Sequence, residues 1–183
     1  MRVLLALVFM VFIAGTAPAK EIEGVKVEPQ VTVNSEALKL NGSGIRKKFL
    51  FKVYVGSLYS AKPLASGPEA LNNTGDKLVR MDFVYPKVEK EKIVEAFQEG
   101  FRNNTPHLAD SAEVKKFLSF FTDDFKRGDQ VDIFLGGDGT VIAKHNGKVL
   151  GTLVSRPLAN AILAIYLGDH PADTNLKRGM LGK

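Results

Sequence analysis

The order of hydrophobic patterns along the chain limits its fold more than any other feature of the sequence. Apolar and polar residues alternate from Glu21 to Leu40, which is typical of short β-strands. A Gly-rich turn is predicted at Asn41–Gly44, and the alternation then continues as one long strand up to Tyr59. Another strand is predicted over residues 77–85. The first half of the chain therefore favours β-structure.

Helical periodicity replaces this alternation in the middle of the chain. Residues 88–102 and 111–121 place apolar side chains on one face of a helix, so each segment is predicted to be an amphipathic helix. Asp110, followed by Glu113, has the spacing of a capping box and is the predicted start of the second helix. Short β-like runs then return, and the Asn146-Gly147 pair between two of them predicts a hairpin.

The last long helix is predicted from Ser155 to Leu167, with Gly168 as its stop signal. It is apolar almost all round, so we expect it to be buried. The tail after it is predicted to form a short final helix. Strands, then helices, then strands, then a helix indicate an α+β fold in which helices cover one side of an antiparallel sheet.

The N-terminal segment has the layout of a secretory signal peptide. Arg2 precedes an apolar run over residues 3–14, and Ala17–Ala19 matches an A-x-A cleavage site. The apolar run is too short to span a bilayer comfortably, so no stable membrane insertion is expected after cleavage. We therefore expect residues 1–19 to be removed, and residues 20–183 to form a single exported domain.

Composition narrows the possible functions further. The chain has no cysteine, so an exported domain must be held together by its hydrophobic core alone. Its net charge is only +5, and charges of both signs alternate along most of the surface segments, which argues against a nucleic-acid partner. The three histidines, His107, His145 and His170, lack metal-ligand spacing, so neither a metal nor another cofactor is predicted.

Arg46 is the strongest candidate for a binding residue. If residues 42–59 form one strand, Arg46, Lys48, Lys52 and Tyr54 share the face opposite Phe49 and Phe51. The two lysines fit an ordinary solvent-facing side of a sheet. Arg46 differs because it follows a Gly-rich segment that permits close backbone approach, and its planar guanidinium can hold a carboxylate or an enolate with two hydrogen bonds.

Two separate motifs resemble those of one known family. The segment "NGSGIRKKFLFKVYVGSLY" (Asn41–Tyr59) is similar to the signature of the chalcone isomerase-like proteins, in particular their exported bacterial branch. The C-terminal segment "LANAILAIYLGDHPADTNLKRGML" (Leu158–Leu181) is similar to the closing helix and final segment of the same family. The resemblance implies a large antiparallel sheet backed by a layer of helices, an open-faced sandwich with a ligand cleft between the layers. It also implies a periplasmic location.

The family contains enzymes that close a chalcone to a flavanone and members that resemble fatty-acid-binding proteins. Arg46 matches the family arginine in its G-x-G-x-R context. The position of the enzymes' threonine is Val53 here, their catalytic tyrosine has no counterpart in "NNTPHL" (Asn103–Leu108), and their hydroxyl residue on the last helix is replaced by Ile165-Tyr166. Only the residue that holds the anion is retained.

These observations support three hypotheses. The first is a non-catalytic binder of a small apolar ligand with a carboxylate or enolate group, such as a fatty acid. Its binding residues would be Arg46, with Tyr54, Tyr59 and Tyr166 as candidate hydroxyl partners. The second is an isomerase of the intramolecular lyase type that acts on an enone, with Arg46 as its catalytic residue. The third is a structural or partner-binding domain in which Arg46 forms an internal ion pair. The sequence does not specify an oligomeric state.

Overall fold

The computed structural model describes residues 20–183, and the predicted signal peptide lies outside them. The strands are β1 (Lys20–Ile22), β2 (Val25–Val27), β3 (Gln30–Val33), β4 (Glu36–Lys48), β5 (Phe51–Ser60), β6 (Lys77–Phe83), β7 (Lys87–Val88), β8 (Phe125–Lys126), β9 (Gln130–Leu135), β10 (Thr140–His145) and β11 (Lys148–Val154). The helices are α1 (Gly67–Asn72), α2 (Lys90–Asn104), α3 (Ala112–Leu118), α4 (Arg156–Leu167) and α5 (Thr174–Met180).

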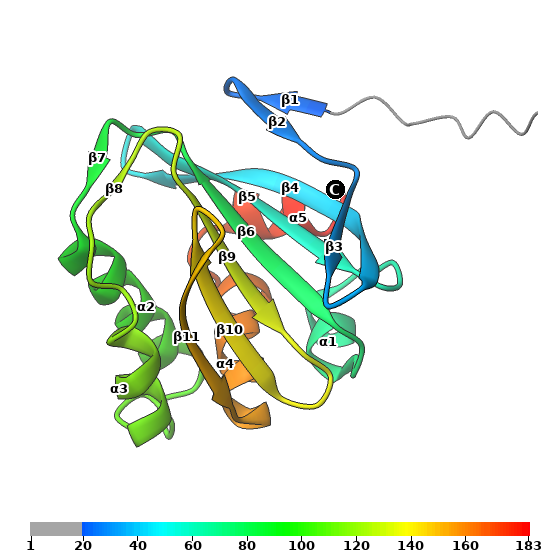
Figure 1. The fold of residues 1–183 in the computed structure, drawn as a ribbon, viewed down its shortest axis with the longest axis vertical. Coiled ribbons are helices and arrows are strands. Elements are labelled where there is room, and N and C mark those ends of the chain that lie inside the picture. Colours follow the sequence, from blue (N-terminus) through cyan, green and yellow to red (C-terminus); the bar gives the residue numbers. More distant parts are fainter. Residues whose placement is uncertain (1–19) are drawn as a thin grey trace, which may run out of the picture.

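Seven strands form one curled antiparallel sheet in the order β11-β10-β9-β6-β5-β4-β3. Figure 1 shows the helices on one side of this sheet, with α4 and α5 behind it and α2 beside its edge. The β1–β2 hairpin forms a separate two-stranded ribbon, and β7 pairs with β8 in another. The predicted α+β fold, an antiparallel sheet backed by helices, is confirmed.

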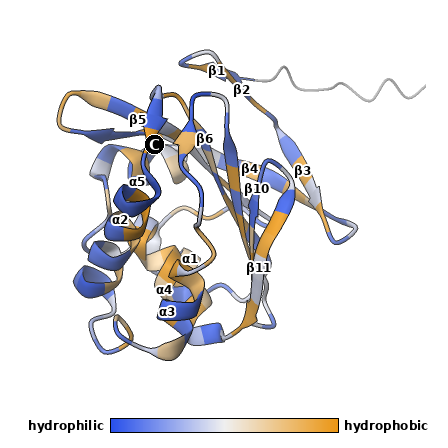
Figure 2. Ribbon diagram, turned by 60° about the vertical axis from the view of Figure 1, so that its left-hand side comes forward, coloured by the Kyte–Doolittle hydropathy of each residue, from blue (hydrophilic) through white to orange (hydrophobic). Residues whose placement is uncertain are grey.

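The main core fills the space between the sheet and the helices. Leu58, Val79 and Ile133 from the strands are fully buried there, together with Phe101 and Ile162 from helices. Helix α4 is buried along nine of its twelve residues, as its apolar sequence predicted. Its apolar character is visible in Figure 2. This helix is the centre of the helical layer.

The segment from Gly42 to Tyr59 is a hairpin and not one long strand, so that prediction was wrong. The chain reverses at Phe49 and Leu50, and Lys48 pairs with Phe51 across the turn. Phe49 adopts a φ of +55°, which bulky residues rarely do. The sequence did not reveal this turn because it contains no Gly or Asn, and because the alternation of residue types continues through it.

The predicted turn at Asn41–Gly44 was also wrong, because these residues lie inside β4. Their glycines serve a different purpose, which is close packing against α5. A Cβ atom on Gly42 would lie 2.2 Å from the carbonyl oxygen of Gly179, and one on Gly44 would lie 3.0 Å from Cα of Leu176. The absence of side chains thus allows the backbone of α5 to rest directly on β4.

The N-cap of α3 is Ser111, one residue after the predicted cap Asp110. The hydroxyl of Ser111, and not the carboxylate of Asp110, accepts a hydrogen bond from the backbone N–H of Val114 at 3.2 Å. Ser155, where the last long helix was predicted to start, caps α4 in the same way. No helix within residues 20–183 is long and apolar enough to cross a membrane.

The close approach of α5 to β4 generates a stability prediction. In Gly42→Ala the new methyl group overlaps the Gly179 carbonyl oxygen, and backbone rather than a flexible side chain must move. We expect the free energy of unfolding to fall by about 3 kcal/mol. Urea unfolding followed by circular dichroism measures this change.

Gly75→Ala is the matched control, because its Cβ would meet only the side chain of Asn73, at 3.1 Å. We expect this variant to stay within about 0.5 kcal/mol of the parent. Equal stability of the two variants would contradict the tight packing inferred for Gly42.

A candidate ligand-binding cleft beside Arg46

A cleft of about 390 Å³ opens between the end of the β4–β5 hairpin and helices α2 and α4. This volume lies within the range of small-molecule sites, about 300–1,000 Å³. The apolar side chains that line it are Phe49, Phe51, Val53, Met81, Val88, Ile93, Ala96, Phe97, Ile165 and Ala172. The polar groups at its inner wall are Arg46, Tyr54 and Tyr166. The cleft is therefore mostly apolar, with a few convergent polar groups.

Arg46 and Tyr54 come together through strand pairing. They are direct partners in the antiparallel register of β4 and β5, so their side chains are neighbours on one face of the sheet. The sequence also predicted a shared face for them, but within a single strand. Because the chain turns at Phe49 and Leu50, the two residues are neighbours on adjacent strands and not on one strand.

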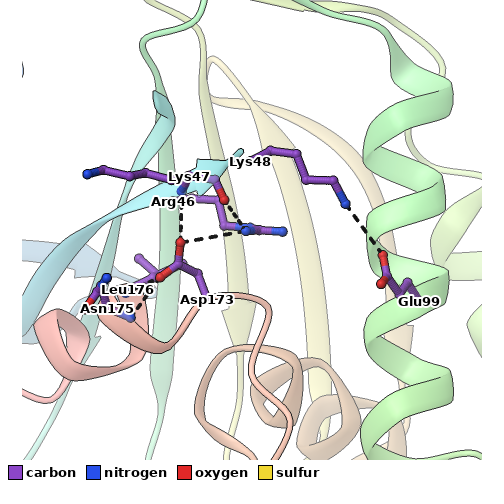
Figure 3. Close-up of polar contacts among 7 residues, drawn as sticks. All are labelled: Arg46, Lys47, Lys48, Glu99, Asp173, Asn175 and Leu176. Carbon is purple, nitrogen blue, oxygen red and sulfur yellow. Dashed lines mark hydrogen bonds and ion pairs between the residues drawn. The ribbon is translucent and has the colours of Figure 1, made fainter. Parts of the chain in front are cut away.

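Arg46 is only partly satisfied by the protein. Its Nη1 lies 3.8 Å from Oδ2 of Asp173 and also donates to the carbonyl oxygen of Lys47. The guanidinium also interacts with the hydroxyl of Tyr54, and neither Nε nor Nη2 has a carbonyl or carboxylate acceptor among residues 20–183. Figure 3 shows the other end of the guanidinium pointing away from Asp173, toward the side of α2. Because a guanidinium has five N–H donors, several of them remain available to a ligand.

Asp173 lies beside Arg46 and accepts hydrogen bonds mainly from backbone N–H groups. Its Oδ1 caps α5 by accepting hydrogen bonds from the N–H groups of Asn175 at 2.8 Å and Leu176 at 3.0 Å. Its Oδ2 accepts from the backbone N–H of Lys47 at 3.0 Å (Figure 3). The carboxylate is thus largely used by backbone donors, and its 3.8 Å separation from Arg46 is longer than a hydrogen bond.

Tyr54 and Tyr166 supply protonated hydroxyl groups to the same wall. Burial raises the pKa of the Tyr54 hydroxyl to about 12, although the charge of Arg46 opposes the shift. Burial likewise raises the pKa of Tyr166 well above its ordinary value. The Tyr166 hydroxyl donates to the sulfur of Met81 at 3.4 Å, a weak acceptor, and interacts with the hydroxyl of Tyr54. Both phenols therefore remain neutral donors at physiological pH.

Tyr59, the remaining candidate, is not brought to the cleft. It lies five residues after Tyr54 on β5, an odd spacing that places it on the opposite face of the sheet. There it packs in a small cluster with Leu38, Leu78 and Phe134, and its hydroxyl donates to the carbonyl oxygen of Glu28 at 3.1 Å. Its role in this structure is packing of the outer face.

Charges of both signs surround the mouth of the cleft. Lys48, Lys87 and Lys92 line it together with Glu89, Glu95 and Glu99. Lys48 and Glu99 face each other across the opening at 4.0 Å, and both side chains are more than half exposed (Figure 3). A pair this exposed contributes little to stability. The positive charge that matters for a bound anion is therefore that of Arg46, deeper in the cleft.

A metal centre is not supported by the side chains that the structure describes. Within residues 20–183 no group of three or more histidine, aspartate and glutamate side chains is placed to hold an ion. His107 and His170 are exposed, and His145 lies 3.4 Å from Asp129. None of these histidines lines the cleft.

The sequence did not identify Asp173 as part of the site. It lies 127 positions after Arg46, and nothing local distinguishes it from an ordinary helix cap. The apolar wall contributed by α2, through Ile93 and Phe97, was also not predicted. Its helical periodicity was visible, but the pattern could not show which part of the apolar face would be left uncovered.

Two substitutions of Asp173 separate its two roles. Asp173→Ala removes both acceptor oxygens, so we expect a loss of about 1–2 kcal/mol in the free energy of unfolding. Asp173→Asn keeps one acceptor for the cap of α5, and we expect it to lose less than half as much. Urea unfolding measures both variants. An equal loss would show that the contacts of Oδ2, with the Lys47 N–H and the charge of Arg46, carry the stabilisation, and not the cap.

Comparisons with known proteins agree with this architecture. The sequence is similar to fatty-acid-binding protein 1 of Arabidopsis thaliana, with 26% identity over 177 residues that cover 80% of this chain. The match spans 63% of the length of that relative. The fold is similar to the crystal structure of an Arabidopsis thaliana fatty-acid binding protein, with a TM-score of 0.62, 21% sequence identity, and coverage of 83% of this chain and 95% of that chain.

The family comparison extends over every element of the structure. The family model described as chalcone isomerase-like matches residues 19–182, from the first strand to the end of α5. Both motifs that carried the resemblance in the sequence lie inside this match. The chain belongs to the chalcone isomerase-like family.

Proposed function

We propose that the cleft binds a small apolar ligand with a carboxylate group, such as a fatty acid, and that it does so without catalysis. The observation that carries this proposal is the position of Arg46. Its guanidinium has free donors at the inner wall of an apolar cleft, beside the two protonated phenols of Tyr54 and Tyr166. A carboxylate is the group that such a set of donors fits best.

The two parts of the cleft supply different contributions to binding. A hydrogen bond between charged groups contributes about 1.5–3 kcal/mol, and the phenolic hydroxyls add neutral hydrogen bonds. Apolar burial contributes about 25 cal/mol for each Å² of ligand surface removed from water. The hydrocarbon part of the ligand would therefore supply most of the affinity, and Arg46 would fix its orientation.

The similarity to fatty-acid-binding protein 1 of Arabidopsis thaliana supports the same class of ligand. That protein is named for fatty-acid binding, and the match covers 80% of this chain. Because the identity is 26%, the similarity supports a class of ligand and not a particular fatty acid. The ligand class rests primarily on the donors and the apolar lining of this cleft.

Binding without turnover fits the tyrosines better than isomerisation does. A general base acts best when its pKa lies near the working pH, whereas the pKa of Tyr54 is about 12 and that of Tyr166 is higher than usual. Among residues 20–183 no histidine reaches the cleft to take over this task. The two phenols at the inner wall of the cleft therefore act as hydrogen-bond donors and not as bases at neutral pH.

A purely structural role for Arg46 is less consistent with its contacts. An internal ion pair would place the guanidinium and the carboxylate in direct hydrogen-bond contact, whereas Nη1 of Arg46 and Oδ2 of Asp173 are 3.8 Å apart. The open cleft beside Arg46 also leaves its remaining donors accessible to a ligand.

Fatty-acid titration tests the proposal directly. In Arg46→Gln we expect the affinity for a long-chain fatty acid to fall about ten- to hundredfold, because the charged hydrogen bond is lost. Isothermal titration or displacement of a fluorescent fatty acid measures the change. Arg102→Gln is the matched control, because Arg102 is exposed at the end of α2 and does not line the cleft.

The tyrosines provide a second matched pair in the same titration. Tyr166→Phe should weaken the binding several-fold, whereas Tyr59→Phe, on the opposite face of the sheet, should not change it. Absence of binding by the parent, or equal effects of Arg46→Gln and Arg102→Gln, would exclude the proposal. Turnover of a chalcone or another enone by the parent, with loss in Arg46→Gln, would favour the isomerase.

We also propose that the protein belongs to an exported bacterial branch of the family and acts in the periplasm. The support is the arrangement of residues 1–19, with Arg2, an apolar run and an A-x-A site, followed at once by the first described strand. Intact-mass analysis of protein recovered from its own host should give a chain that starts at Lys20. A chain that retains residues 1–19 would refute cleavage.

A further inference from the structure

The tip of the β4–β5 hairpin exposes three consecutive apolar side chains. Phe49 is 86% exposed, Leu50 93% and Phe51 57%. In Figure 2 the end of this hairpin projects from the body of the molecule as an apolar segment next to hydrophilic ones. Single exposed apolar residues are ordinary, but three in a row at a projecting tip leave an apolar surface that water covers unfavourably.

The backbone of the tip gives no reason for this composition. Phe49 has a φ of +55°, a region that favours Gly or Asn and disfavours bulky side chains. A phenylalanine there neither suits the turn nor packs into the core. Unfavourable conformations of this kind are found where a side chain serves a function, so the position points to a task outside the folding of the hairpin.

Lysines surround the apolar tip. Lys47 forms no ion pair within residues 20–183, and Lys48 lies 4.0 Å from Glu99 across the cleft mouth. Lys52 is held by Glu23 at 2.7 Å. The tip therefore combines an apolar end with Lys47, which is unpaired within residues 20–183, and Lys48, whose exposed pair with Glu99 is weak. This combination is complementary to an anionic lipid surface, where apolar groups enter the interface and cations meet the headgroups.

We propose that the β4–β5 hairpin tip docks the protein on a membrane surface that contains anionic lipid, with Phe49, Leu50 and Phe51 in the interface. A stable protein–protein interface buries about 1,200–2,000 Å², far more than three side chains offer, so a bilayer fits the tip better. Phe49 and Phe51 also line the cleft, so docking places the cleft mouth at the lipid. The docking does not depend on which ligand the cleft holds.

Vesicle flotation tests this proposal without any ligand in the cleft. Protein that starts at Lys20 is used, because the apolar run of residues 3–14 would bind lipid by itself and every described element lies after it. A thermal melt first shows that this protein is folded. It is then mixed with vesicles of phosphatidylcholine alone or with phosphatidylglycerol added.

We expect binding to the mixed vesicles that weakens with salt, and little binding to phosphatidylcholine alone. The double variant Phe49→Asn/Leu50→Ser should lose about tenfold or more in binding, because two apolar groups no longer enter the interface. Asn suits the positive φ of residue 49, so the hairpin should remain folded. Lys47→Gln/Lys48→Gln should lose about fivefold per lysine and most of the salt dependence.

Val149→Ser/Val154→Ser is the matched control. It removes two other exposed apolar side chains, 51% and 75% exposed, from β11 at the far edge of the sheet. This variant should bind mixed vesicles as the parent does. No vesicle binding by the folded parent, or equal losses in the control and the tip variant, would overturn the proposal. Dimerisation that the tip variant abolishes, without lipid binding, would assign the tip to a second copy of the chain.

Discussion

The direct contact between α5 and β4 is the constraint on which the site depends. Gly42 and Gly44 on the strand and Gly179 on the helix leave no side chains between the two backbones. This contact places Asp173, at the start of α5, against the backbone N–H of Lys47 and next to Arg46. The position of the arginine is therefore set by backbone packing, and only part of its guanidinium is used by contacts within the protein.

The cleft forms beside this contact, where the sheet, α4 and α2 each contribute a wall. The sheet contributes Arg46, Tyr54 and Met81, and α4 contributes Tyr166, a buried tyrosine in an otherwise apolar helix. Helix α2 covers the opposite wall with Phe97 and its neighbours. Tyrosine hydroxyls are protonated at neutral pH, and burial raises the pKa of both still further, so they serve as donors rather than bases.

The β4–β5 hairpin carries both the proposed ligand-binding residues and the proposed membrane-docking residues. Arg46 and Tyr54 lie side by side near its inner part, where the sheet packs on the helices, and Phe49 and Leu50 lie at its projecting tip. A ligand that is mostly hydrocarbon is sparingly soluble and is stored in membranes, so a cleft whose mouth lies at the bilayer shortens the path through water. Ligand binding by Arg46 and Tyr54 and membrane docking by the hairpin tip are thus compatible proposals.

The sequence by itself determined the α+β class, the buried character of α4, its start at Ser155 and the shared face of Arg46 and Tyr54. These features depend on periodicity, local caps and a short motif, which are properties of neighbouring residues. The tertiary structure decided that Gly42 and Gly44 lie in a strand, that Phe49 reverses the chain, and that Tyr166 rather than Tyr59 lines the cleft with Arg46. It also brought Asp173 to the site. These outcomes depend on which distant backbones can approach one another and which face of β5 the helices cover, and no local pattern encodes either.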